Sequence, residues 1–180
     1  IWGNSPRDPK ILPPARIAEY ADGRMHISRT RVRWPRHPRA LTLREAARGL
    51  AALLLDAVNR WSMGVGASAL AFSGGVDSGI LAHLAKEVLT LRLITVDFGQ
   101  GGGFLDQAEK AASILGLPVR LTTPSKSEAE EMLRDAVWSC ETAERISVET
   151  ALPILCAARE ARQLGLTSMM TGHGADELFG

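Results

Sequence analysis

Apolar and polar positions alternate in a regular way through most of this chain of 180 residues. From about residue 42 onward, short apolar runs are separated by stretches in which apolar residues recur at helical spacing. We predict strands at 68–73, 91–98, 118–123 and 167–171. We predict helices at 77–89, 104–116 and 147–164, a short helix capped by Ser127–Glu130, and a further element that starts at Asp176. This order predicts an α/β fold with a parallel sheet covered by helices on both faces.

The residues before this alternation predict a helix and a short hairpin. Thr42–Glu45 has the pattern of a capping box, and helical spacing of apolar residues continues to Trp61. Residues 1–14 hold four prolines and are expected to be extended, while strands at 15–20 and 24–34 are expected to meet at Asp22-Gly23. Pro35 and Pro38 mark a boundary. We therefore expect an arm with a β-hairpin at 1–40 and a second domain at 41–180.

Charge is distributed unevenly along the chain. The formal net charge is +1, but residues 1–39 carry a balance of +6 and the remainder a balance of −5. A basic arm can bind nucleic acid or an acidic partner, but this arm lacks the patterns of known RNA-binding modules. We interpret it as a solvated strand face or as a segment that docks on its own acidic domain, and we do not expect a nucleic-acid partner.

Composition bears on where in the cell the protein is expected to act. No apolar run reaches the 18 residues that a membrane span needs, and the chain opens with no signal-peptide pattern. The two cysteines, Cys140 and Cys156, show no metal-binding spacing and are interpreted as reduced thiols. We expect a cytoplasmic protein. The sequence does not set the oligomeric state, for which we expect a homo-oligomer.

The hexapeptide Ser73–Ser78 is the most informative motif. Its sequence is Ser-Gly-Gly-Val-Asp-Ser, and it lies between a predicted strand and a predicted helix. Unpaired amides and the positive end of the helix would converge there on an anion, and the glycines Gly74 and Gly75 would let backbone approach it. Ser73 and Ser78 would add hydroxyl donors. The motif therefore predicts a phosphate site, against the alternative of a turn that merely ends a strand.

Asp77 is the unusual member of this motif. A carboxylate beside phosphates repels them unless a cation lies between, and Mg²⁺ prefers a few carboxylates together with phosphate oxygens. The hexapeptide is not a P-loop of the Gly-Lys-Ser/Thr type, because no lysine follows until Lys86. We therefore expect a magnesium ion rather than a lysine at the phosphates.

The last ten residues, Thr171–Gly180, repeat this design of glycines followed by acids after a strand end. Because the carboxyl ends of parallel strands share one edge of the sheet, Asp77 and Asp176 could bind the same Mg²⁺. Such a cation would draw charge from a departing pyrophosphate. Alternatively, Asp176 and Glu177 are only acids at a helix start. Gly99–Gly103 could be a second phosphate cradle, but we favour a mobile loop.

Taken together, the two motifs resemble those of a known family. Ser73–Ser78 is similar to the pyrophosphate loop of N-type ATP pyrophosphatases, and Gly172–Gly180 (Gly-His-Gly-Ala-Asp-Glu-Leu-Phe-Gly) resembles a motif of the asparagine synthetases and the related β-lactam synthetases. Glu149–Ile154 also looks like the family segment before this motif. The resemblance covers residues from about 42 to 180 and implies an adenine nucleotide alpha hydrolase-like fold.

The resemblance also implies an activity and a set of site residues. The family uses ATP and Mg²⁺ to activate a carboxylate as an acyl-adenylate, which an amine or ammonia converts to an amide with release of AMP. By position, Ser73, Gly74, Gly75, Asp77 and Ser78 would hold pyrophosphate and metal, and Asp176 would be the second metal ligand. Glu177 is a weaker candidate. The adenosine pocket would be lined by Phe72, by Val96 or its neighbour Asp97, and by the backbone of Thr171 and Gly172.

Three departures from the family pattern affect the expected function. His173 stands where asparagine synthetases usually have Glu, and it could be a general base or a structural residue. The glutaminase domain of asparagine synthetases is expected to be absent, with residues 1–40 its remnant or linker, so ammonia would come free or from a separate glutaminase. The downstream catalytic lysine of the family is not found, since Lys86, Lys110 and Lys126 do not match its position. We expect either that the domain continues past Gly180 or that its activity is reduced or altered.

Two other hypotheses remain open. One is another ATP pyrophosphatase, such as an ammonia-dependent NAD synthetase or a tRNA-thiolating enzyme, which would share the first motif but not Asp-Glu-Leu-Phe-Gly. The other is a nucleotide-binding regulatory or scaffold module without catalysis. The leading hypothesis is an ATP-dependent carbon-nitrogen ligase of amino-acid biosynthesis in which Asp77, His173 and Asp176 act on small-molecule substrates.

Overall fold

A computed structural model describes residues 12–13, 15–29, 40–99 and 103–176 of the chain. The backbone divides into two units, residues 1–42 and residues 43–180. The helices are α1 (Leu43–Ser62), α2 (Val76–Ala85), α3 (Phe104–Leu115), α4 (Lys126–Cys140) and α5 (Arg145–Gln163). The strands are β1 (Arg16–Ala21), β2 (Arg24–Arg29), β3 (Ala67–Ala71), β4 (Thr90–Val96), β5 (Val119–Thr122) and β6 (Met169–Thr171).

The first unit contains the predicted hairpin. Strands β1 and β2 pair antiparallel, with Arg16 opposite Arg29 and Ala21 opposite Arg24. Asp22 and Gly23 both have positive φ, at 51° and 73°, which is the backbone that a two-residue hairpin turn requires. The predicted second strand is confirmed over β2, which reaches Arg29; the rest of that prediction, residues 30–34, lies outside the described residues.

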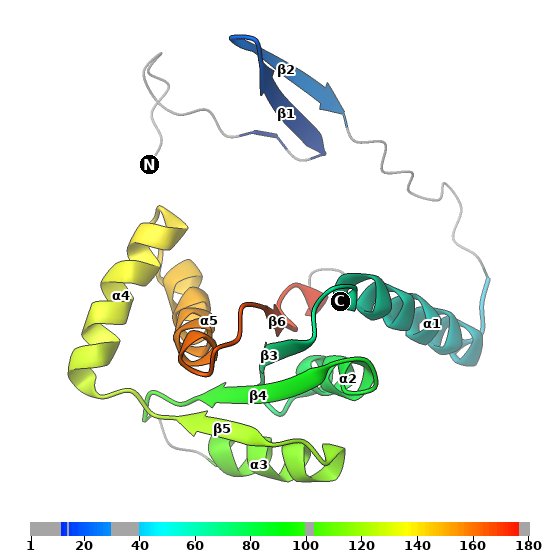
Figure 1. The fold of residues 1–180 in the computed structure, drawn as a ribbon, viewed down its shortest axis with the longest axis vertical. Helices are drawn as coiled ribbons and strands as arrows, with labels where there is room; N and C mark the ends of the chain where they lie inside the picture. The colour runs from blue at the N-terminus through cyan, green and yellow to red at the C-terminus, as the bar shows by residue number, and fades with distance from the viewer. Residues whose placement is uncertain (1–11, 14, 30–39, 100–102, 177–180) are drawn as a thin grey trace. The chain divides into compact units, whose positions relative to one another are not determined.

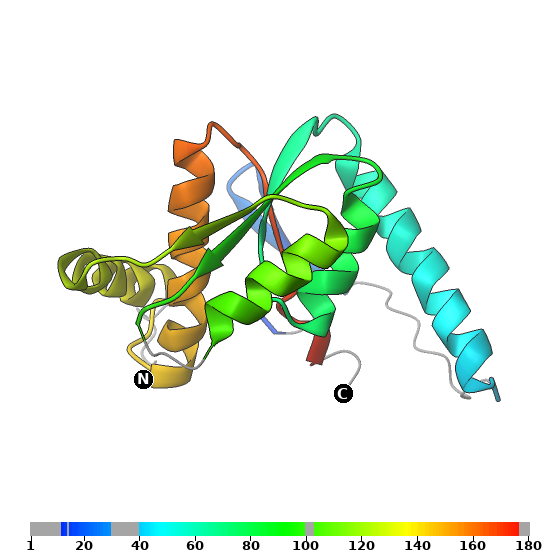
Figure 2. The same ribbon diagram turned by 90° about the horizontal axis from the view of Figure 1, so that it is seen from below.

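The second unit is a sheet of four parallel strands in the order β5-β4-β3-β6. Helices α2 and α3 pack on one face, and α5 packs on the other face against β3, β4 and β6 (Figure 1). Figure 2 shows the same layers from below, with α1 beside α2 and α4 beside α5. The prediction of a parallel sheet with helices on both faces is thus confirmed.

The core follows from the alternation of side chains along the strands. Leu70, Phe72, Leu91 and Leu93 face α2 and α3, while Ala69 and Ile94 face α5. The α5 layer uses small residues, Ala157 and Ala161, so this helix approaches the sheet closely. Both faces of the sheet are therefore covered along the middle of β3 and along β4 from Leu93 to Thr95, whereas Thr90 and Arg92 near the start of β4 are exposed.

Two predicted helix boundaries were wrong. The helix expected to be short and to start at Ser127 is the 15-residue α4, whose capping box is formed by Ser125 and Glu128. The hydroxyl of Ser125 accepts from the amide of Glu128, and the Glu128 carboxylate accepts from the amide of Ser125. The Ser125 hydroxyl also donates to the Glu128 carboxylate at 2.6 Å, and this bond, together with the bond from the Ser125 amide, lowers the pKa of Glu128. Helix α2 stops at Ala85 rather than at residue 89, because the chain turns there and Leu89 is buried in the core.

Candidate functional site: a cavity between two glycine loops

The first glycine loop begins where β3 reaches the carboxyl edge of the sheet. Phe72 is buried; its amide donates to the carbonyl of Ile94 at 2.8 Å, and its carbonyl accepts from the hydroxyl of Thr95 at 2.7 Å. These two bonds fix the end of β3 to β4. The chain can leave the sheet only at Ser73, so the position of the loop is set by the core.

Gly74 holds this loop against helix α3. Its φ is +76°, and a Cβ added at Gly74 would lie 2.8 Å from the Cα of Ala108 and 3.0 Å from its amide nitrogen. Both observations exclude a side chain at this position. The loop was expected to use its glycines for the approach to a phosphate, which stays a prediction; the structure shows in addition that Gly74 packs against α3.

Helix α2 starts directly after the loop. Gly75 is its N-cap residue and forms no side-chain capping bond, so the first amides of α2 keep their donor capacity toward the carboxyl edge of the sheet. These amides and the partial positive charge of the helix end favour an anion there. Asp77, in the first turn, is exposed and brings one carboxylate to the same place.

The two serines of the motif hold the loop closed. The hydroxyls of Ser73 and Ser78 lie 3.1 Å apart, and the Ser78 hydroxyl also accepts from the amide of Ser73 at 3.3 Å. The Ser73 hydroxyl in turn accepts from the amide of Gly75 at 3.2 Å. Ser78 is buried, so its hydroxyl serves mainly to hold the loop together. Ser73 is exposed, so its hydroxyl is accessible to a ligand in solution.

The second glycine loop follows β6 and contacts the first. A Cβ added at Gly172 would lie 3.1 Å from the amide nitrogen of Ser78 and 3.2 Å from the Cβ of Asp77. The amide of the next residue, His173, donates to the hydroxyl of Thr171 at 3.2 Å. Gly172 therefore allows the chain after β6 to lie directly against the first turn of α2.

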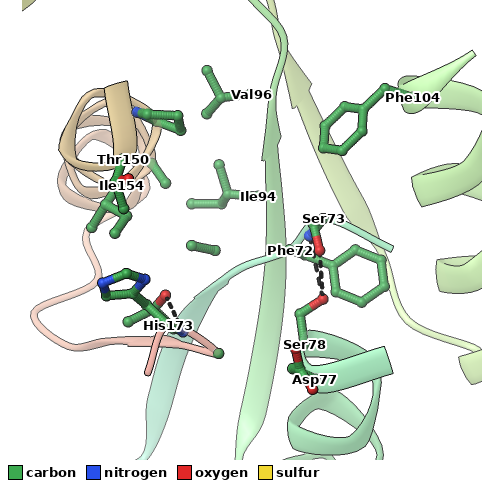
Figure 3. A pocket seen from close by; sticks show the side chains of 15 residues that line it. Phe72, Ser73, Asp77, Ser78, Ile94, Val96, Phe104, Thr150, Ile154 and His173 are labelled. Atoms are coloured by element: carbon green, nitrogen blue, oxygen red, sulfur yellow. Dashed lines mark hydrogen bonds between the residues drawn. The ribbon is translucent and has the colours of Figure 1, made fainter. Parts of the chain in front are cut away.

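A cavity of about 260 Å³ opens between the two loops, the carboxyl ends of β3 and β4, and helix α5. Figure 3 shows Asp77, Ser78 and His173 at one end of it and Val96 and Phe104 at the other. The predicted site residues that line this cavity are Phe72, Ser73, Asp77, Ser78, Val96, Thr171, Gly172 and His173. The structure thus brings most of the predicted residues of both motifs together.

Some predicted residues lie elsewhere. Gly74, Gly75 and Asp176 are not among the residues that line the cavity. Asp176 is exposed, in a helical turn that begins at Ala175, and Glu177 lies outside the described residues. Asp97, the alternative to Val96, lines a neighbouring cavity of about 860 Å³ instead.

Sequence reasoning missed the wall that α5 contributes. Thr150, Pro153, Ile154 and Ala157 line the cavity from this helix, and Phe104 lines it from the start of α3 (Figure 3). The aromatic residue directly after the glycine run at 99–103, and a proline inside a predicted helix, were the signals available in the sequence. Neither indicates a cavity until the sheet has been assembled.

Few charged side chains line the cavity. Among the described residues that line it, Asp77 is the acidic one, and none is a lysine or an arginine. Lys86 instead donates to the carbonyl of Leu115 at 3.0 Å, at the end of α3. Lys126 is exposed and lies 3.9 Å from Glu130. Within the described residues, the features that would favour an anionic ligand are therefore the amides of α2, or a metal ion bound beside them.

A magnesium ion fits this donor set. The described part of the chain contains no group of three or more His, Cys, Asp and Glu residues that could enclose a metal. Magnesium does not need such a cage, since one or two carboxylates and phosphate oxygens complete its coordination. Asp77, beside the free amides of α2, is the residue placed to supply one carboxylate.

The fold and its two facing loops define an adenine nucleotide alpha hydrolase-like α/β domain. A solved structure of the NH3-dependent NAD synthetase from Campylobacter jejuni subsp. jejuni, in complex with the nitrate ion, has this fold; its TM-score is 0.52 at 15% identity, over 74% of this chain and 60% of that one. The family model for asparagine synthase matches residues 49–180. The chain belongs to the asparagine synthase family.

Two curated relatives give the extent of the similarity. The chain is 34% identical over 110 residues to asparagine synthetase [glutamine-hydrolyzing] 1 of Bacillus subtilis, a match that covers 60% of this chain and 17% of that protein. It is 24% identical over 118 residues to the root asparagine synthetase [glutamine-hydrolyzing] of Pisum sativum, covering 60% of this chain and 20% of that protein. The chain thus spans about a fifth of the length of these relatives. No helix among the described residues is long and apolar enough to span a membrane.

The role of Gly74 predicts a large difference between two glycines of one segment. Gly74→Ala should lower the free energy of unfolding by about 2 kcal/mol or more, because it adds a Cβ at positive φ against the α3 backbone. Gly79→Ala in α2 is the matched control. A Cβ at Gly79 meets nothing within 4 Å, so this change should raise stability by up to about 1 kcal/mol. Urea unfolding measures both, and equal effects would contradict the assignment.

The two serines should also differ. Ser78→Ala removes a buried hydroxyl that accepts from the Ser73 amide, and we expect a loss of about 1–2 kcal/mol in unfolding free energy. Ser73→Ala, at an exposed position, should cost less. A double-mutant cycle measured by urea unfolding should give a coupling energy of at least about 0.5 kcal/mol. Additive effects would show that the hydroxyl pair does not hold the loop.

Proposed function

We propose that this chain forms the nucleotide-binding part of an ATP-dependent ligase that joins a carboxylate to an amine or to ammonia. One observation supports this proposal most directly: Gly172 lies against Asp77 and Ser78, so both family motifs meet at one end of the cavity. Membership of the asparagine synthase family supports the reaction type. The substrates of the whole protein are part of the proposal, because the chain spans only a fraction of its relatives.

The binding mode follows from the layout of the cavity. The triphosphate would lie at the end where the α2 amides are free, between Asp77 and the second loop. The adenosine would extend toward Val96 and Phe104, between the sheet and α5. Asp77, together with Asp176, would hold Mg²⁺. The ion would neutralise phosphate charge and so favour attack at the α-phosphorus.

The proposed reaction has two steps that balance. A substrate carboxylate oxygen attacks the α-phosphorus, the bond to the bridging oxygen breaks, and pyrophosphate leaves with the electron pair. An amine nitrogen then attacks the acyl carbon, and AMP leaves, giving an amide. The α2 amides and Ser73 would stabilise the departing pyrophosphate. His173, exposed beside the cavity, would take the proton that the amine loses.

A second candidate has its own supporting observation. In the described part of the chain, the residues that line the cavity include no lysine or arginine, the side chains that commonly stabilise charge in phosphoryl transfer. A nucleotide-binding regulatory module that does not catalyse is therefore the alternative. The NAD synthetase likeness supports the fold, and an ammonia-dependent NAD synthetase remains a related enzyme alternative. The protein would act as a homo-oligomer. Its ammonia would be free in solution or would come from a separate glutaminase.

Exchange of labelled pyrophosphate into ATP tests the ligase against the module. We expect exchange that depends on an added carboxylate and on Mg²⁺ in the wild-type chain. Asp77→Asn should reduce it by about a hundredfold or more, because the change removes a metal ligand at the transferring phosphate. Asp176→Asn should raise the Mg²⁺ concentration needed for half-maximal exchange.

Asp106→Asn is the matched control for the aspartate variants. Asp106 also lies in the first turn of a helix, α3, but it does not line the cavity. It should keep normal exchange, so a loss confined to Asp77→Asn would not be a general effect of charge at a helix start. Nucleotide binding without exchange in the wild-type chain would favour the module, and normal exchange by Asp77→Asn would contradict the metal role.

The contact between the loops gives a separate test. Gly172→Ala places a Cβ 3.1 Å from the Ser78 amide, so it should move the second loop away and weaken Mg·ATP binding by about tenfold. Gly66→Ala, at a position where a Cβ meets nothing within 4 Å, is the control and should bind normally. Calorimetric titration measures both affinities. Unchanged binding by Gly172→Ala would show that close loop contact is not required.

A further inference from the structure

A charged side chain lies on an interior strand of the sheet. Strand β4 has a neighbour on each side in the order β5-β4-β3-β6, and interior strands of parallel sheets are usually apolar on both faces. Arg92, in the first half of β4, departs from this pattern and is exposed. In the described part of the chain, no carboxylate lies within ion-pair distance of its guanidinium. A structural ion pair therefore does not account for Arg92.

The strand register places a second arginine on the same face of the sheet. Ile94 of β4 pairs with Arg120 of β5, and paired residues of neighbouring strands share a face. Ile94 packs against Ala157 and Ala161 of α5, so Arg120 belongs to the face that α5 covers. Arg92 precedes Ile94 by two residues and, by the alternation of side chains along a strand, belongs to that face as well. The two arginines are thus neighbours across β4 and β5.

Both arginines line a cavity of about 430 Å³ at the amino edge of the sheet. Its apolar walls include Ala67 at the start of β3, Pro118 just before β5, and Leu164 and Leu166 just after α5. Leu164 is 46% exposed, so part of this apolar wall is open to solvent. Among the described residues, none lines both this cavity and the one between the glycine loops, which lies at the carboxyl edge. The two cavities are therefore separate.

The charged side chains on the walls of this cavity have one sign. Within the described residues, Arg92 and Arg120 are the charged residues that line it, and no Asp or Glu does. Arg120 lies 3.2 Å from the carboxylate of Glu160, but Glu160 lines a different cavity. A guanidinium can bind a carboxylate through two parallel hydrogen bonds, and apolar walls favour a ligand that removes them from water. Together these features match an anion with an apolar body.

We propose that this cavity is a second ligand site, which binds a small carboxylic acid that carries an apolar chain or ring. The carboxylate would accept hydrogen bonds from the guanidinium of Arg92, and Arg120 would add positive charge beside it. The chain or ring would lie on Leu164 and Leu166 and remove their apolar surface from water. This site does not depend on the proposed nucleotide site, because the two cavities lie at opposite edges of the sheet.

Calorimetric titration of the full chain with phenylbutyrate and with octanoate tests the proposal. One acid carries a ring and the other a chain, and phenylbutanol is the matched analogue without the carboxylate. We expect saturable binding of at least one of the acids, with one site per chain, and binding of the alcohol that is weaker than that of phenylbutyrate by about tenfold or more. The acid should still bind in the presence of saturating Mg·ATP, because the nucleotide would occupy the other cavity.

Variants then separate the role of the arginine from that of the apolar wall. Arg92→Gln removes the charge, so it should weaken acid binding by about tenfold and leave binding of the alcohol unchanged. Arg92→Lys keeps the charge without the planar guanidinium and should recover part of the loss. Leu164→Ala should weaken binding of the acid and of the alcohol alike, by about threefold. Arg134→Gln is the matched control, because Arg134 is exposed on α4 and does not line this cavity.

Any of four results would overturn the proposal. Failure of both acids to bind at concentrations up to about 10 mM would show that the cavity holds no such ligand. Equal affinities for phenylbutyrate and phenylbutanol would show that the carboxylate is not recognised. Equal losses in Arg92→Gln and Arg134→Gln would show that only the net charge matters. Displacement of the acid by Mg·ATP would place it between the glycine loops instead. None of these results bears on the proposed function, which pyrophosphate exchange tests separately.

Discussion

The site depends on one close approach, that of Gly172 to the first turn of α2. Each glycine loop starts at the carboxyl edge of a parallel strand, and β3 and β6 are neighbours in the sheet. The adjacency of these strands already brings the two loops near each other. Only a residue without a side chain, however, lets the second glycine loop contact the backbone of Asp77 and Ser78. The order of strands and this single glycine together define the end of the cavity that both motifs share.

The architecture could be predicted from the sequence because apolar residues follow two clear patterns, short continuous runs in the strands and helical spacing in the helices. The apolar runs at β3 and β4 and the helical spacing between them indicate a parallel α/β sheet, and Asp22-Gly23 indicates a hairpin turn that the dihedral angles confirm. Helix lengths were harder to predict. The capping residue of α4 was predicted two positions too late, because Ser125 and Ser127 both precede an acid by three residues and only the hydrogen bonds in the structure distinguish them.

The residues of the candidate site that belong to local sequence motifs could be predicted. Those that reach the site only through tertiary packing were missed. Ser73, Asp77 and Gly172 could be found because glycines, acids and a strand end occur together in sequence. Thr150 and Ile154 could not be found, since a helix wall becomes part of a cavity only when it is packed on a sheet. Gly74 was predicted from its motif, but its packing against α3 could not be, because that contact involves a residue more than thirty positions away.

In the second glycine loop, the residues that meet the backbone constraints are not the residue that carries the exposed side chain. Gly172 provides the close approach, and Gly174 adopts a φ of +96°, so the residues on either side of His173 carry the conformational constraints. The side chain between them is exposed and forms no part of the core. Residue 173 can therefore be exchanged without rebuilding the turn. A scaffold of this kind can acquire new acid–base chemistry by replacing one amino acid while the two loops around the cavity stay the same.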